Sequence, residues 1–139
     1  MTPSAVETAR AAFKVVASAE GRSLKDKLQK NYRRVFDGVR SLGFETGPQA
    51  GPVVALKLSD SETAIRFWNR TIDEGLYTNI AIPPATPDGL SLLRVSISAA
   101  HSDQEINRAL AILADVGEEL GIIKSARRYT RRVDSRATA

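Results

Sequence analysis

The sequence contains no cysteine, one methionine, one tryptophan and one histidine among its 139 residues. The absence of cysteine excludes a disulfide framework, a thiolate metal site and a cysteine nucleophile. Long hydrophobic runs are missing too: none approaches the ~20 apolar residues that span a bilayer, and no basic stretch precedes an apolar one at the N-terminus. We therefore expect one soluble, cytoplasmic domain without a membrane segment, large enough to bury a core without disulfides.

The net charge of +4 is concentrated at the C-terminal end of the chain. Residues 124–139 contain Lys124 and five arginines against a single acidic residue, Asp134, so residues 1–123 are close to neutral. A short basic end rich in Ser, Thr and Ala is typical of a solvated tail. We predict a domain over residues 1–123 and a disordered basic tail over residues 124–139.

A second group of basic residues lies where a helix is expected. Apolar residues recur at helical spacing from Leu24 to Leu42, so the basic side chains occupy the opposite, solvent-facing side. Binding of nucleic acid by this side and the tail is a further hypothesis, which predicts an affinity that falls steeply with salt. Because the sequence lacks clustered aromatics on which bases stack, nucleic acid is not expected as a partner. The basic residues are Arg22, Lys25, Lys27, Lys30, Arg33 and Arg34.

Capping residues predict two helices near the N-terminus. Residues 4–19 carry an apolar stripe at helical spacing, and Gly21 marks a break or bend after them. Ser23 is the expected N-cap of a second helix. That helix is expected to end at Gly43, because glycine readily adopts the left-handed conformation that closes a helix.

Two capping-box patterns predict two more helices. Ser59 with Glu62 opens a helix that ends at Gly75, and Ser102 with Glu105 opens the last helix. Strands are expected over residues 53–58, 76–82 and 92–98, with a further short strand near Phe44 left open. The order α-α-β-α-β-β-α favours an α+β domain, in which a small, mostly antiparallel sheet has helices packed on one face.

The last predicted strand places one charged residue opposite the core. Leu93, Val95 and Ile97 share one face of the strand, so Arg94 lies on the other. A guanidinium suits a bidentate grip on a carboxylate or a phosphate, and the stiff proline-rich loop before the strand could wall such a site. From the pattern alone, the favoured interpretation is a surface arginine at the edge of the sheet, with binding of an anion as the alternative.

Signatures of catalysis are missing from the chain. His101 precedes a helix cap and has no Asp or Ser at a spacing that would orient it as a base, so we predict a local hydrogen-bonding or packing role. There is no glycine-rich phosphate loop, no His-Glu-x-x-His and no Gly-x-Ser-x-Gly. We predict no catalytic residue and no metal site within the chain.

Five segments resemble one known family at near-family spacing. They are Gly-Pro-Val-Val-Ala, Phe-Trp, Glu-Gly-Leu-Tyr-Thr-Asn, Pro-Pro-Ala-Thr-Pro and Leu-Leu-Arg-Val-Ser-Ile-Ser-Ala-Ala-His, at residues 51–55, 67–68, 74–79, 83–87 and 92–101. Together they resemble the C-terminal small domain of the α-oxoamine synthases. These pyridoxal-phosphate (PLP) enzymes of the aminotransferase class I and II superfamily include serine palmitoyltransferase, 8-amino-7-oxononanoate synthase, 5-aminolevulinate synthase and 2-amino-3-ketobutyrate coenzyme A ligase.

The resemblance implies the C-terminal domain of a fold-type I PLP enzyme. Such an enzyme condenses an amino acid with an acyl thioester, from coenzyme A or an acyl carrier, with loss of carbon dioxide, and it is a homodimer. The family's Schiff-base lysine belongs to the large domain, and neither Lys14 nor Lys57 lies in a recognisable Schiff-base motif. We therefore expect pyridoxal 5'-phosphate in a full-length parent, no cofactor on this chain alone, and no transferase activity from it.

Two features of the family map onto this sequence residue by residue. Arg94 matches the strand arginine that binds the α-carboxylate of the amino-acid substrate. The mobile loop near the acyl substrate corresponds to Pro83, Pro84, Ala85, Thr86 and Pro87. Ile82 stands where serine palmitoyltransferases carry an arginine, so the subfamily, the amino acid and the acyl donor stay open.

A second hypothesis is a free-standing small domain that acts as a binding or regulatory module. It would dock on a full-length partner through the surface that the large domain covers in the family, and an exposed apolar patch would mark that surface. The sequence does not distinguish a natural truncation from a piece of a longer protein.

Overall fold

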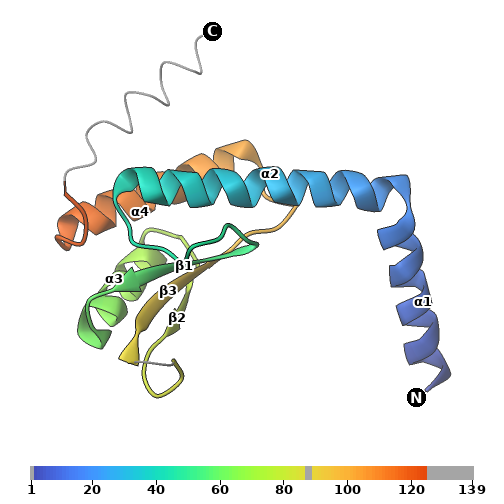
Figure 1. Cartoon of the computed structure of the whole chain (residues 1–139), viewed down its shortest axis with the longest axis horizontal. Helices are drawn as coiled ribbons and strands as arrows, with labels where there is room; N and C mark the ends of the chain where they lie inside the picture. The colour runs from blue at the N-terminus through green and yellow to red at the C-terminus, as the bar shows by residue number, and fades with distance from the viewer. Residues whose placement is uncertain (1, 87–88, 125–139) are drawn as a thin grey trace, which may run out of the picture.

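The computed structural model describes residues 2–86 and 89–124 (Figure 1). Within these residues four helices accompany one three-stranded antiparallel sheet, in the predicted order, which confirms the α+β class. The helices are α1 (Pro3–Ala17), α2 (Ala19–Leu42), α3 (Ser61–Asp73) and α4 (Asp103–Glu119), and the strands are β1 (Val53–Leu58), β2 (Asn79–Ala81) and β3 (Ser91–Ser96). The expected basic tail lies, from residue 125 on, outside the described residues.

The sheet has the order β1-β3-β2, so that β3 is the central strand and pairs antiparallel with both neighbours. The strand predicted over residues 76–82 is reduced to β2. The reason is local: the backbone N–H of Leu76 donates to Thr71 O, 2.8 Å away, and the indole of Trp68 donates to Thr78 O, so these residues complete the end of α3 instead of a ladder. Near Phe44 the described structure has a single bridge, between Thr46 and Leu56, in place of a strand.

Helices α2, α3 and α4 cover one face of the sheet and bury its alternating apolar residues. Figure 1 shows α2 and α4 lying side by side above the sheet, with α3 beside it. Leu56 and Leu93 are fully buried where β1 and β3 pair, and the rings of Phe44 and Phe67 stack with centroids 5.7 Å apart. As predicted for the last strand, Leu93, Val95 and Ile97 are all buried in this core.

The junction of α1 and α2 corrects the predicted cap of the second helix. Ser18, not Ser23, is the N-cap of α2, and its hydroxyl accepts a hydrogen bond from the backbone N–H of Gly21. A Cβ at Gly21 would lie 2.2 Å from Val15 O, so only glycine fits where the chain bends. The predicted end of α2 is confirmed, because Gly43 has a φ of 101°.

The predicted capping boxes have different outcomes. Ser102 and Glu105 form the expected reciprocal box at the start of α4. At α3 the prediction is wrong: the N-cap is Asp60, one residue after Ser59, and its carboxylate accepts from the backbone N–H of Thr63 at 2.8 Å. A carboxylate and a hydroxyl both cap helices well, so neighbouring Ser and Asp residues compete for the position.

Candidate functional site

The sheet has a second face, which the helices do not cover. Along β1 and β3 the residues that alternate with the core are exposed or half-buried, and strand pairing brings them together. We call this surface the open face. It consists of Val53, Ala55, Lys57, Asn79, Ala81, Leu92, Arg94 and Ser96.

Arg94 lies at the centre of the open face. It pairs with Ala55 of β1 on one side and with Asn79 of β2 on the other, and its side chain is exposed. The interpretation of Arg94 as an edge residue is therefore wrong, because β3 is the central strand. No carboxylate within residues 2–86 and 89–124 forms an ion pair with its guanidinium, which leaves the fork of N–H donors without a protein acceptor in the described part of the chain.

Lys57, the lysine of the open face, forms an ion pair with a carboxylate. The ammonium group of Lys57 lies 2.8 Å from the carboxylate of Glu45, in an ion pair at one border of this face. A Schiff base requires an amine that points into a cofactor pocket, whereas the ammonium group of Lys57 is directed to the carboxylate of Glu45. The other lysines of the described residues are exposed on α1, on α2 and after α4, so this part of the chain does not by itself fit PLP.

The predicted substrate loop connects β2 to β3. Pro83, Pro84 and Ala85 are exposed, and a turn between Ala85 N–H and Ile82 O, 2.9 Å apart, begins the loop. The hydroxyl of Thr86 donates to Leu90 O across it. The loop therefore borders the end of the open face at which Ala81 pairs with Leu92, next to Arg94 along β3. Pro87, the last residue of the predicted loop, lies outside the described residues.

A second polar network holds the segment that follows α3. The indole N–H of Trp68 donates to Thr78 O at 2.9 Å, and the hydroxyls of Thr71 and Thr78 lie 3.2 Å apart in the core. This network fixes the start of β2, and with it Asn79 beside Arg94. Asn79 could not be identified from the sequence, because only the register between β2 and β3 shows that it is a neighbour of Arg94.

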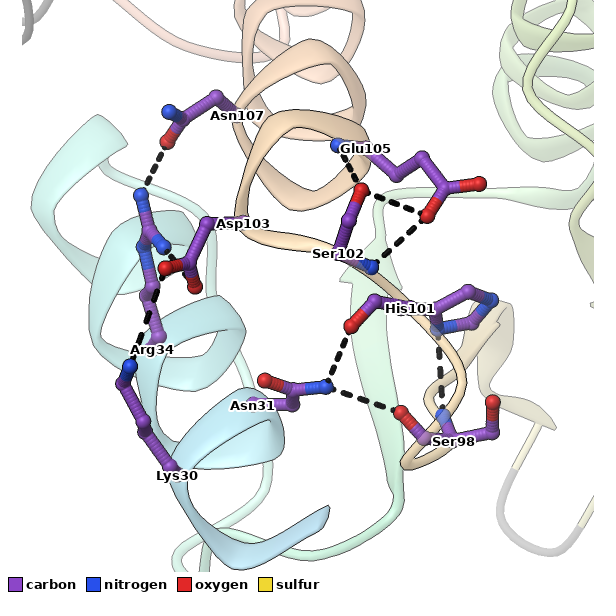
Figure 2. A network of polar contacts seen from close by, with 9 residues as sticks. All are labelled: Lys30, Asn31, Arg34, Ser98, His101, Ser102, Asp103, Glu105 and Asn107. Carbon is purple, nitrogen blue, oxygen red and sulfur yellow. Dashed lines mark hydrogen bonds and ion pairs between the residues drawn. The ribbon is translucent and has the colours of Figure 1, made fainter. Parts of the chain in front are cut away.

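The turn after β3 is tied to α2 by a buried amide (Figure 2). Asn31, 2% exposed, donates hydrogen bonds to Ser98 O and His101 O, both at 3.0 Å. His101 Nδ1 accepts from the backbone N–H of Ser98, which fits the local hydrogen-bonding role predicted for this histidine. Backbone and side-chain hydrogen bonds from Ser102 lower the pKa of Glu105, which keeps the cap of α4 charged. The network fixes the C-terminal end of β3, the strand that carries Arg94, against α2.

Helix α1 presents apolar side chains to solvent. None of its residues is buried, and Figure 1 shows it bent sharply away from α2 and standing clear of the sheet. Phe13 and Val16 are 73% and 71% exposed and Val6 is 47% exposed, which is the kind of patch predicted for a docking surface.

The basic residues of α2 point outward as expected, except that half-buried Arg34 bonds to Asp103 at 2.7 Å.

The described residues contain neither a cluster of metal ligands nor a helix that could cross a membrane. No three His, Asp or Glu side chains within residues 2–86 and 89–124 gather as metal ligands would. None of the described helices combines the length and the apolar character that crossing a bilayer requires.

Comparison with known proteins gives consistent results. A family model described as aminotransferase class I and II matches residues 1–113. The chain is 46% identical over 105 residues to a serine palmitoyltransferase of Caulobacter vibrioides, covering 76% of this chain and 26% of the relative. It is 32% identical over 123 residues to an 8-amino-7-oxononanoate synthase of Geobacter sulfurreducens, covering 88% of this chain and 32% of the relative.

Solved structures agree with the sequence relatives. A serine palmitoyltransferase of S. paucimobilis, solved with bound PLP and myriocin, superimposes with a TM-score of 0.79 at 36% identity. That match covers 87% of this chain and 30% of the solved chain. The chain thus spans between about a quarter and a third of the length of the relatives it matches.

Proposed function

Since this chain belongs to the aminotransferase class I and II family, we propose that it is the C-terminal, substrate-binding part of a PLP-dependent α-oxoamine synthase. The relatives confirm the predicted resemblance to that family. The observation that carries the proposal is the position of Arg94. It is the charged group at the centre of the open face and pairs with no described carboxylate, whereas Lys57, the other charged residue of this face, is paired with Glu45.

In this proposal Arg94 binds the carboxylate of an amino acid. A guanidinium on a central strand donates two parallel N–H bonds to a carboxylate, and the rigid backbone around it reduces the ordering cost of binding. Ala55, with its small side chain, leaves room for the ligand beside the guanidinium. In the parent enzyme PLP supplies the electron sink for decarboxylative condensation. The contribution of this chain is to hold and orient the amino acid.

The loop of Pro83, Pro84, Ala85, Thr86 and Pro87 is proposed to border the acyl thioester. Pro83 and Pro84 restrict the backbone where this loop leaves β2, next to the open face. We further propose a homodimeric, cytoplasmic parent that uses an acyl thioester of coenzyme A or of an acyl carrier as its second substrate.

The chain alone is proposed to be inactive. Its described lysines are exposed or paired with Glu45, so the amine needed for PLP comes from another part of the parent. The exposed Phe13 and Val16 on α1 support the same conclusion, because covering an apolar patch of this kind stabilises a domain interface.

The test is an assay of the protein at its natural length beside the 139-residue chain. With PLP, L-serine and palmitoyl-CoA as probes, we expect thioester-dependent release of carbon dioxide from the natural-length protein and none from the chain alone. Arg94→Lys, which keeps the charge but loses the fork, should raise the KM for the amino acid and leave the KM for the thioester unchanged. An unchanged KM for every amino acid tested would contradict the proposed role of Arg94.

A second candidate function is a binding module, favoured specifically by the apolar side of α1. It predicts that the natural product has no cofactor lysine and that the chain binds a full-length enzyme of the family through α1. Phe13→Asp would then abolish that binding, because a charge would be buried in the apolar contact. Size-exclusion chromatography of the mixture distinguishes the two candidates.

A further inference from the structure

The donors of the open face are unequally available. Lys57 is paired with Glu45, and Ala55 and Ala81 carry no polar side-chain atoms. Ser96 carries a hydroxyl but lies at the end of β3, opposite Val53. Arg94 and Asn79, which occupy paired positions on adjacent strands, are therefore the directly paired polar residues of this face. Side chains directly opposite each other in an antiparallel pair have Cβ atoms about 5 Å apart, which is within reach of one shared ligand.

Asn79 is held rigidly although its side chain is exposed. The preceding residue is anchored twice, by Trp68 Nε1 to Thr78 O at 2.9 Å and by the contact between the hydroxyls of Thr71 and Thr78. Thr71 and Thr78 are 0% and 2% exposed, so this anchor lies in the core. No hydrogen bond of the Asn79 side chain is formed within residues 2–86 and 89–124, so its amide is available to a ligand. A buried network that supports an exposed, unengaged amide is the arrangement expected of a binding residue.

We propose that Asn79 is a second ligand of the substrate carboxylate and that its amide donates a third hydrogen bond beside the two from Arg94. This inference rests on the proposed function and names a further specificity-determining residue of the same site. A carboxylate offers about four lone-pair positions, and a bidentate arginine uses two of them. The Asn79 amide occupies a third and favours a planar anion over a neutral group of the same shape.

The proposal makes a prediction about the substrate's charge. Hydrogen bonds to an ionised acceptor are about twice as strong as those between neutral groups. Asn79 should therefore contribute more to the binding of L-serine than to the binding of L-serinamide, in which the carboxylate is replaced by a neutral amide. A residue that only stabilises the strand would affect both ligands equally.

The experiment uses the natural-length protein loaded with PLP. Dissociation constants for L-serine and L-serinamide are measured from the change in cofactor absorbance, and KM values for palmitoyl-CoA are measured in parallel. Asn79→Ala should weaken L-serine binding at least about tenfold, weaken L-serinamide binding less, and leave the KM for palmitoyl-CoA within about twofold. Asn79→Asp should be worse, since a second carboxylate repels the first.

Two controls keep the result interpretable. Asn79→Thr keeps a residue suited to a strand but removes the amide. We expect it to lose as much L-serine affinity as Asn79→Ala, and such a loss could not be attributed to a disturbed β2. Asn69→Ala removes an exposed amide from α3 and should change neither ligand's affinity.

The outcomes separate this inference from the proposed function. Loss of L-serine affinity in Arg94→Ala but not in either Asn79 variant would overturn the role of Asn79 alone. Unchanged affinity in Arg94→Ala as well, or no binding of L-serine by the unsubstituted protein, would overturn the proposed function and this inference together. Equal losses for L-serine and L-serinamide in the Asn79 variants would assign Asn79 a structural role and overturn the inference.

Discussion

The two faces of the sheet differ although they are built from the same strands. On the core face, Leu56, Leu93 and Val95 are buried under the helices, and every position is apolar or small. On the open face, the side chains of Arg94 and Asn79 point away from that core and have no hydrogen-bond or ion-pair partner among the described residues. Stability therefore depends on one face, and the proposed binding of substrate depends on the other. Substitutions of neighbouring residues in β3 can separate these two roles.

The largest effect is expected from the core face. Leu93→Ala should lower the free energy of unfolding by about 3 kcal/mol, because a fully buried leucine loses its contacts and leaves a cavity. Urea unfolding of the 139-residue chain, followed by circular dichroism, measures the change. Leu92→Ala is the matched control: this neighbour lies half-buried on the open face and should cost much less. Equal losses at the two positions would break the distinction between the faces.

A smaller loss is expected where the turn after β3 joins α2. Asn31→Ala should cost roughly 1–3 kcal/mol, because the carbonyl groups of Ser98 and His101 would lose a buried donor. The same unfolding assay applies, with Asn107→Ala as the control, since Asn107 only accepts a hydrogen bond from Arg34. If the control cost as much as Asn31→Ala, the buried amide would not be what holds the turn.

The local sequence pattern was enough to predict on which face of the sheet a strand residue lies, but not which residues of other strands lie beside it. The alternation of Leu93, Arg94 and Val95 has a period of two, which any strand imposes, so the side of the sheet on which Arg94 lies could be predicted. Its central position, and Asn79 beside it, depend on pairing between residues far apart in sequence. Periodicity carries no information about that order. The predicted edge position was wrong for this reason, and Asn79 was missed.

The caps show a similar limit at shorter range. Ser59 and Asp60 are both good N-cap residues, and which of them caps α3 is decided by the side chains that follow. Asp60 receives hydrogen bonds from the backbone N–H and the hydroxyl of Thr63 and from the hydroxyl of Ser59. Helix existence was thus predictable from the sequence, whereas the first residue of the helix was not.

The Asp60 cap predicts that the stability of α3, which packs on the core face, depends on pH. Hydrogen bonds from Ser59 and then Thr63 lower the pKa of Asp60 from 3.8 to about 2. Because the folded-state pKa is the lower one, its contribution to stability is complete above about pH 4 and is lost as the pH falls through 2. Asp60→Asn keeps a capping side chain but does not titrate.

The measurement is the difference in melting temperature between the wild type and Asp60→Asn, taken from pH 6 down to pH 2. We expect the wild type to melt at the higher temperature at pH 6 and the difference to shrink below pH 4. A difference that stays constant over this range would mean that the charge on Asp60 does not stabilise α3.

The smallest effect on stability is expected at the centre of the open face. Arg94→Ala removes an exposed side chain that pairs with no described carboxylate, so the free energy of unfolding of the 139-residue chain should change by less than about 0.5 kcal/mol. Lys57→Ala, which breaks an ion pair with Glu45, is the comparison on the same face.

The significance of a small change at Arg94 lies in what it excludes. A loss above about 1 kcal/mol would mean that the arginine serves the fold, and the open face would then offer no charged group reserved for a ligand. A near-zero change in the free energy of unfolding, together with the weakened amino-acid binding expected of Arg94→Lys in the natural-length protein, would show that the core face serves stability and the open face serves binding. The arginine would then occupy the middle of the sheet for a ligand and not for the stability of the domain.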